Sequence, residues 1–194
     1  MAEIKKGKRM KRLIQKKIKK TKENLYYILS ALMIGLIVGG IDALFGRVLI
    51  AITDFRGRYI QILIWFLPIA GLFICWMYHR FNEMSLKGMT LVLETAQGKR
   101  ADIPLALVPL VMVGTWITHL FGGSAGREGV AVQIGATLSH WFARRFKFAD
   151  NRTILLIAGM AAGFGGLFQT PFAAVFFAME VVVTGKMLYQ AFLP

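Results

Sequence analysis

From residue 25 onward the chain alternates between long apolar stretches and short polar or glycine-rich breaks. The first apolar stretch, residues 25–44, is long enough as a helix to cross the roughly 30 Å hydrocarbon core of a bilayer. Polar positions between 46 and 58 predict an outer loop, and residues 60–77 predict a second span that returns with a kink at Pro68. This pattern predicts an all-α, polytopic membrane protein.

The remainder of the chain repeats the pattern with shorter pieces. Residues 87–94 are too short to span, so we expect a re-entrant helix that starts at Gly88–Thr90 near the bilayer midplane. Gly159 and Gly163 are four residues apart, which in lipid allows two helices to approach closely. Further helices are expected over residues 103–121, 130–142, 153–168 and 171–187, the last of them starting at Pro171.

Composition supports a membrane protein and adds a separate N-terminal region. The chain is 56% hydrophobic, with a mean hydropathy of +0.57. Eleven of its 24 lysines and arginines lie between Lys5 and Lys22, which accounts for much of the net charge of +14. We therefore expect residues 1–23 to form a basic cytoplasmic tail or amphipathic helix on the membrane surface, ahead of a membrane-embedded unit over residues 24–194.

The same charge distribution bears on location and partners. A basic segment before the first span favours a cytoplasmic N-terminus in a multi-pass protein of the plasma membrane. No aromatic residues interleave the lysine run, so we expect no nucleic-acid partner. The single cysteine, Cys75, permits no intrachain disulfide, and His79, His119 and His140 lack the spacing of metal ligands. We expect neither a metal nor another cofactor.

The candidate chemistry lies in a glycine-rich run over residues 122–135, which reads GGSAGREGVAVQIG. Its glycines predict irregular backbone that leads into a new helix at about Val130. The free N–H groups of that first turn, together with the helix dipole, suit an anion, yet the carboxyl of Glu128 stands at the same helix end. We interpret this as competition, in which Glu128 fills the anion site when ionised and leaves it when protonated.

Two segments carry a resemblance to a known family. Residues 126–135, GREGVAVQIG, resemble the GREGP-x-VQ-[IL]-G signature of the CLC family of chloride channels and anion/proton antiporters, with Val130 in place of the proline. Residues 168–180, FQTPFAAVFFAME, are similar to a second family segment, F-N-x-P-L-A-G-x-x-F-x-x-E. The two segments stand in the same order as in the family. In that family the glutamate at the position of Glu128 is the gate.

The resemblance implies a fold, a site and partners. CLC proteins have two inverted-topology halves with broken and re-entrant helices. They form homodimers in which each subunit has its own pathway. This sequence resembles the first half, so a second half-repeat is expected. Met89 takes the place of the serine in the family's GSGIP motif, which, together with Val130, resembles the fluoride/proton antiporter branch. The implied function is fluoride export coupled to protons, with Glu128 as the gating residue. The implied anion-binding residues are Gly88, Met89, Thr90, Gly126, Arg127, Gly129 and Val130.

Several alternatives remain open from the sequence. The chain is also compatible with a CLC-type chloride channel or chloride/proton antiporter, because Met89 could be ordinary helix packing. Residues 122–126 satisfy G-x-S-x-G, which would make Ser124 the nucleophile of an intramembrane serine hydrolase. A membrane interaction protein without transport is a further alternative. Glu128 could be a structural acid paired with Arg127, and Arg127 could instead bind Glu94 or carbonyls of the glycine break.

Overall fold

The computed structural model describes residues 2–100, 102–146 and 152–182, and these segments are helical apart from short connections. The elements are α1 (Ala2–Leu63), η1 (Ile64–Phe66), α2 (Leu67–Phe81), η2 (Glu83–Lys87), α3 (Met89–Ala96), α4 (Leu107–Leu120), α5 (Glu128–Arg145), α6 (Arg152–Phe168) and α7 (Pro171–Val181). The expected continuation of the last helix to residue 187 lies outside the described residues.

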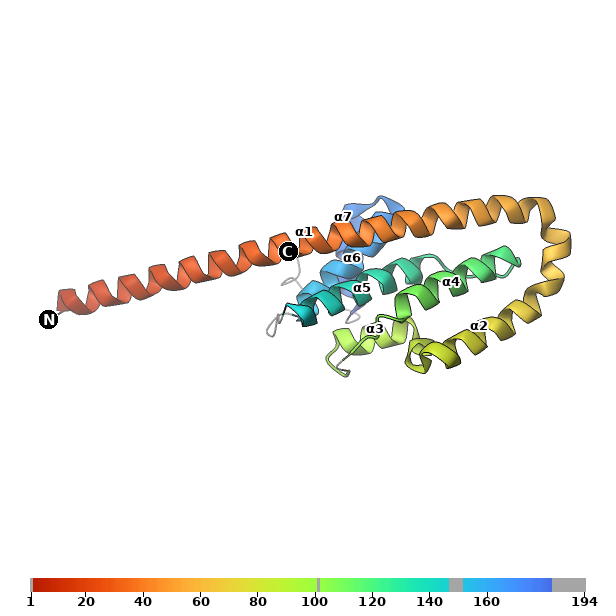
Figure 1. Ribbon diagram of the computed structural model, residues 1–194. Helices are drawn as coiled ribbons and strands as arrows, with labels where there is room; N and C mark the ends of the chain where they lie inside the picture. The colour runs from red at the N-terminus through yellow and green to blue at the C-terminus, as the bar shows by residue number, and fades with distance from the viewer. Residues whose placement is uncertain (1, 101, 147–151, 183–194) are drawn as a thin grey trace.

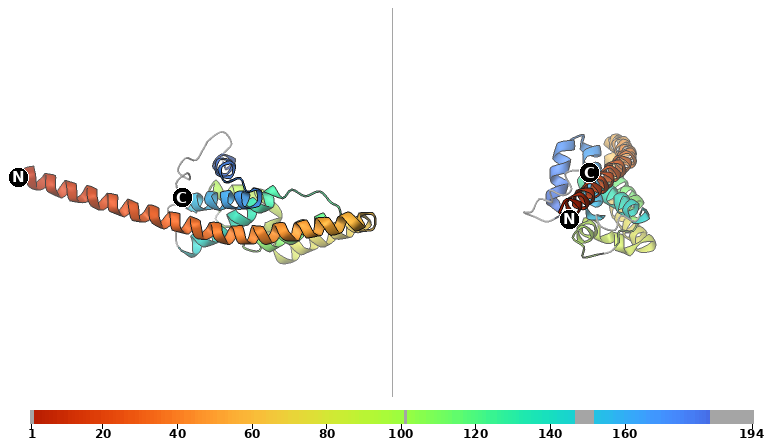
Figure 2. Two further views of the ribbon diagram at one scale, coloured as in Figure 1. Left: turned by 90° about the horizontal axis from the view of Figure 1, so that it is seen from above. Right: turned by 90° about the vertical axis from the view of Figure 1, so that its left-hand side faces the viewer.

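The helices form a bundle from which the N-terminal part of α1 projects (Figure 1). The chain reverses direction between α1 and α2, and α2 returns along the bundle (Figure 1). The view from above shows α1 running past the bundle as a single long rod (Figure 2). Among the described residues, one stretch is long and apolar enough to cross a membrane by length and composition. It is Asn24–Phe81, which contains this reversal of direction. Helices α4, α6 and α7 are apolar but shorter.

The loop expected over residues 46–58 is wrong, because α1 continues as a helix through that region to Leu63. Its buried face explains the continuation: Phe45 and Leu49 are buried in a cluster formed with residues of α4 and α5. Trp116 of α4 donates an indole N–H to the carbonyl of Phe45 over 3.2 Å, and the two rings stack. Three charged residues of this region, Arg47, Asp54 and Arg58, lie on the exposed side of the helix and not in its packed face.

The bend after α1 also differs from the expectation. Pro68 does not kink a continuous span; it sits at the start of α2, where its missing N–H breaks no helical hydrogen bond. The change of direction precedes it, at Tyr59, whose backbone leaves the helical region (φ −124°, ψ 16°), and in the short 3-10 turn η1. The predicted second span is therefore divided between the end of α1 and α2.

The tightest packing in the bundle joins α5 to α6. A Cβ atom on Gly135 would lie 1.9 Å from the carbonyl oxygen of Gly159, and one on Gly163 would lie 2.1 Å from the carbonyl oxygen of Ala131. No side chain fits at these crossing points, so the two backbones are in direct contact. The prediction that Gly159 and Gly163 allow close approach of helices is confirmed, and Gly135 of the GREGVAVQIG segment is its partner.

The two expected helix breaks are present. The short helix α3 begins at Met89 directly after Gly88, whose positive φ of 50° favours glycine. The glycine-rich run separates α4 from α5, and α5 begins two residues earlier than expected, at Glu128. The expected helix start at Pro171 is also confirmed. Helix α7 begins with this proline, after a break at Gln169 and Thr170.

Candidate functional site

Two helix starts meet around one side chain, that of Gln133 on α5. The amide oxygen Oε1 of Gln133 lies 3.5 Å from the point that a Cβ atom on Gly88 would occupy, at the start of α3. Its amide nitrogen Nε2 lies 3.6 Å from the corresponding point on Gly129, in the first turn of α5. The absence of side chains at both glycines leaves room for this amide. The N-terminal ends of α3 and α5, each with unsatisfied backbone N–H groups, are thereby brought to one place.

The amide oxygen of Gln133 lacks a hydrogen-bond partner. Gln133 is only 8% exposed, and its Oε1 is buried without a donor nearby. A buried acceptor left unpaired costs free energy, and such groups are uncommon in folded proteins unless a ligand or water completes them. Gln133 was not among the site residues proposed from the sequence. A signal was available, because Gln133 is the one polar residue in the otherwise apolar buried run from Val130 to Ile134.

Glu128 is exposed and lies in the first turn of α5. Among the residues that the structure describes, no cation lies within ion-pair distance of its carboxylate, Arg127 included. The alternative in which Glu128 is held by Arg127 is therefore not supported. A carboxylate at a helix N-terminus is favoured by the helix dipole and is free to change its position.

Arg127 does not bind Glu94, so that alternative is wrong. Glu94 is held instead by Arg100, with Nε and Oε2 2.5 Å apart, and by Lys87 at 3.5 Å. These contacts lower the pKa of Glu94, chiefly through the hydrogen bond from Arg100. Arg127 itself is exposed at the N-cap of α5, where its charge is solvated.

The other predicted anion-binding residues lie near the two helix starts but differ in what they contact. Met89 is half-buried and packs against the apolar cluster around α3 and α6, whereas Thr90 is exposed. Val130 is buried among apolar residues of α1 and α4, so only its backbone can face a ligand. Gly126 is exposed, with open space where a side chain would stand. The backbone, rather than the side chains, supplies the donors at this position.

Asp42 is a second group that sequence reasoning did not propose as functional. It is 1% exposed on the face of α1 that packs against α6, and both carboxylate oxygens lack a partner. Its Oδ2 lies 3.4 Å from the point where a Cβ atom on Gly166 would stand. An acid inside an apolar span is expensive to bury and is commonly functional.

The geometry contradicts a nucleophile elbow at Ser124. That motif requires a strand before the serine, and the residues that precede it here form the helix α4. The histidine that follows it in the sequence, His140, lies near the far end of α5, with its Nε2 3.3 Å from Oδ1 of Asp102. The serine, histidine and acid of a hydrolase are therefore not assembled around Ser124.

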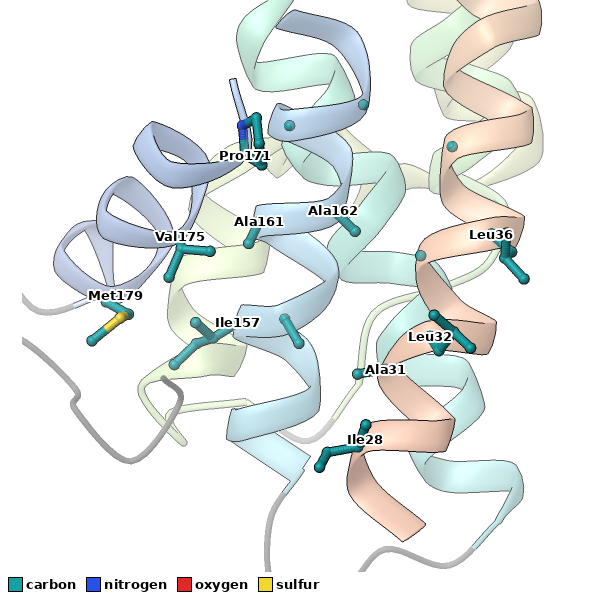
Figure 3. Close-up of a pocket in the computed structure, with 15 residues that line it drawn as sticks. Ile28, Ala31, Leu32, Leu36, Ile157, Ala161, Ala162, Pro171, Val175 and Met179 are labelled. Carbon is teal, nitrogen blue, oxygen red and sulfur yellow. The ribbon is translucent and has the colours of Figure 1, made fainter. Parts of the chain in front are cut away.

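An apolar groove with a volume of about 610 Å³ lies between α1, α6 and α7. Figure 3 shows Ala162 on the side of α6 that faces α1, and Ile157 and Ala161 on the side that faces Val175 and Met179 of α7. Every residue that lines the groove is apolar. It offers no polar side chain to an ion, so it is a surface for lipid or another apolar segment and not the anion site.

A bundle of apolar helices, in which glycine-containing breaks place the starts of two helices beside one side chain, defines an α-helical membrane protein with interrupted helices. The family model described as voltage gated chloride channel matches residues 70–194. The chain belongs to this family.

Comparison with individual proteins agrees with this assignment. A crystal structure of a CLC-type fluoride/proton antiporter superposes with a TM-score of 0.83 at 48% identity, covering 86% of this chain and 42% of that one. A chloride/fluoride channel protein of Pseudomonas syringae pv. tomato is 36% identical over 84% of this chain and 36% of its own length. A H(+)/Cl(−) exchange transporter, ClcA of Citrobacter koseri, is 27% identical over 87% of this chain and 38% of its own length. The chain thus spans about two fifths of these relatives.

Proposed function

We propose that this chain forms half of a halide transport pathway coupled to protons, and that the transported anion is fluoride. The observation that carries the proposal is Glu128, an exposed carboxylate without an ion-pair partner in the described structure. It lies at the start of α5, where the start of α3 also lies. Relatives named as a chloride/fluoride channel and as a fluoride/proton antiporter support the same reading.

In the proposed mechanism the anion binds at the joined helix starts, near Gly88, Met89 and Gly129. Backbone N–H groups stabilise it without a fixed cation, which would hold a small, hard anion too tightly for release. Glu128 takes the same position when it is ionised and leaves it when it is protonated. Each exchange therefore moves an anion in one direction against a proton in the other.

Chloride transport is the second candidate, supported by the similarity to a H(+)/Cl(−) exchange transporter. Met89 bears on the choice, because a thioether offers no hydroxyl donor to the anion. Comparing fluoride with chloride efflux from the same liposomes decides between the two anions. A chloride rate equal to or above the fluoride rate would rule out fluoride as the preferred substrate.

The assembly proposed around this site follows from the family. We infer that a second half-repeat completes the pathway and that the complete subunit forms a homodimer in the plasma membrane with a cytoplasmic N-terminus. The apolar groove between α1, α6 and α7 supports the need for a further apolar segment, since its lining leaves no polar group to solvate. The basic residues 5–22 support the orientation.

The test of the gating role is proton movement in liposomes that hold the chain extended by a second half of the kind its relatives possess. Glu128→Gln keeps the size of the side chain but cannot ionise. We expect an outward fluoride gradient to drive proton uptake with the parent and to fail to do so with Glu128→Gln. Asp54→Asn, which neutralises an exposed acid on α1, is the control and should retain coupling. Equal proton uptake by Glu128→Gln and the parent would overturn the gate.

A further inference from the structure

A polar cavity lies at the opposite end of α5 from Glu128. It has a volume of about 170 Å³ and is formed by the end of α3, the last turns of α5 and the first turn of α6. Ala143 of α5 and Leu155 of α6 pack here against Ile34 of α1. The cavity therefore lies at the end of the bundle from which the basic N-terminal residues emerge, as the position of the projecting part of α1 shows (Figure 1).

The cavity contains a buried imidazole that is not fully engaged. His140 is 3% exposed and lines the cavity. Its Nε2 lies 3.3 Å from Oδ1 of Asp102, while its Nδ1 is buried without a partner. With Nε2–H directed at the carboxylate of Asp102, Nδ1 of the neutral imidazole is an acceptor. A ligand that brings a hydroxyl donor to Nδ1, such as the P–OH of inorganic phosphate or a hydroxyl of a lipid headgroup, would therefore be stabilised.

Cationic and backbone donors line the same cavity. Arg152 and Thr153 belong to the first turn of α6, whose N–H groups have no partner within the helix. Arg152 forms no ion pair among the described residues. Arg100 binds Glu94 through Nε, which leaves its two terminal nitrogens available. The cavity thus combines two guanidinium groups, an imidazole and a helix start.

The nearby carboxylates do not cancel this charge. Glu94 is held by Arg100 and Lys87, and Asp102 is paired with the guanidinium of Arg144. Burial opposes ionisation of Asp102, but the hydrogen bond and charge of Arg144 outweigh it, so the pKa of Asp102 lies below its usual value. Both acids already have cationic partners, whereas Arg152 does not.

We propose that this cavity binds a phosphate group, carried either by inorganic phosphate or by the headgroup of an anionic phospholipid. A tetrahedral phosphate presents several acceptor oxygens, which match the donors of Arg100, Arg152 and the first turn of α6 better than a single halide ion would. Basic pockets between membrane helices on the cytoplasmic side are suited to such headgroups. This site is separate from the anion position near Gln133 and does not depend on transport.

The test measures ligand-induced stabilisation of the detergent-solubilised protein with three probes: inorganic phosphate, dioctanoyl-phosphatidylglycerol and dioctanoylglycerol, which lacks the phosphate. A ligand that binds the folded state raises its unfolding temperature in a saturable way. We expect saturable stabilisation by one or both phosphate-bearing probes and none by dioctanoylglycerol. The probe that acts identifies the source of the phosphate.

Two variants and a control connect binding to this cavity. Arg152→Gln removes an exposed cation and is expected to weaken the affinity by about tenfold, the loss typical of one charge-assisted hydrogen bond. His140→Gln should weaken it similarly, and Arg145→Gln, an exposed arginine at the same end of α5 that does not line the cavity, should not. Equal losses in Arg152→Gln and Arg145→Gln, or no saturable binding by the parent, would overturn the proposal.

Discussion

At the scale of single residues, the glycines of the GREGVAVQIG segment serve two different purposes. Gly129 leaves space beside the amide of Gln133, as Gly88 does from α3. Gly135, six residues later, does not face the Gln133 amide. Its missing side chain instead allows contact with the backbone of Gly159. A signature that reads as one functional unit therefore contains a site residue and a packing residue within two helical turns.

The first residue-scale prediction concerns Gln133, under the proposed function. Gln133→Leu keeps the approximate volume but removes the amide beside the two helix starts. We expect fluoride efflux from liposomes to fall about tenfold, because the anion loses a polar neighbour. The unfolding temperature should stay the same or rise, since an unpaired buried acceptor is removed.

Thr137 provides a matched control on the same helix. Its hydroxyl is also buried without a partner, one turn beyond Gln133. Thr137→Val should leave the fluoride efflux rate unchanged while affecting stability in the same direction. If both substitutions reduce efflux equally, the effect of Gln133 is a general effect of altering α5 and not a contact with the anion.

At the scale of elements, the contact between α5 and α6 positions the site. The start of α5 is held by backbone-to-backbone contact with α6 through Gly135, Gly159 and Gly163. Membrane helices gain little from burying apolar surface against each other, because lipid is equally apolar, so close packing of small residues supplies the attraction. A helix held in this way can present its first turn at a constant position.

Gly135→Ala tests this element. The added Cβ would meet the carbonyl of Gly159 at 1.9 Å, so the helices must move apart. We expect the free energy of unfolding to fall by about 1–3 kcal/mol, the range for overpacked cores. Gly40→Ala on α1, where the added atom meets nothing within 4 Å, is the control and should not destabilise. Reversible unfolding in detergent measures both, and similar losses would contradict the packing argument.

At the scale of the whole molecule, large apolar side chains remain exposed on α1, η1, α2 and α7, among them Leu36, Trp65, Leu72 and Phe172. Exposed apolar side chains of this size and number require lipid or another protein segment to cover them. The chain spans about two fifths of the relatives it matches, so part of this surface is available for a second half-repeat.

The corresponding prediction compares the chain alone with the chain extended by a second half. We expect the extended version to release fluoride from liposomes and the chain alone to release none above empty liposomes. The physical reason is that the helix starts of α3 and α5 supply only one side of an anion pathway. Equal efflux rates from the two preparations would show that the chain completes a pathway without a second half-repeat.

Much of the fold was predictable because hydrophobic periodicity and helix-breaking residues act locally. Gly88 and Pro171 set helix starts through their own backbone restrictions, so both starts were predicted correctly. The helical course of residues 46–58 was not predictable in the same way. Its charged residues suggested a loop, and only the burial of Phe45 and Leu49 against α4 and α5 accounts for the helix.

The sequence by itself determined the helical class, the breaks at Gly88, in the glycine-rich run and before Pro171, the basic N-terminal region and the acid at the start of α5. Each of these follows from side-chain chemistry over a few neighbouring residues. The tertiary structure alone decided that α3 and α5 begin at the same place, that Gln133 lies between them, and that Asp42 faces α6 without a partner. These are contacts between residues far apart in the chain. Their geometry depends on how closely the helices pack, which the glycine contacts of α5 and α6 set.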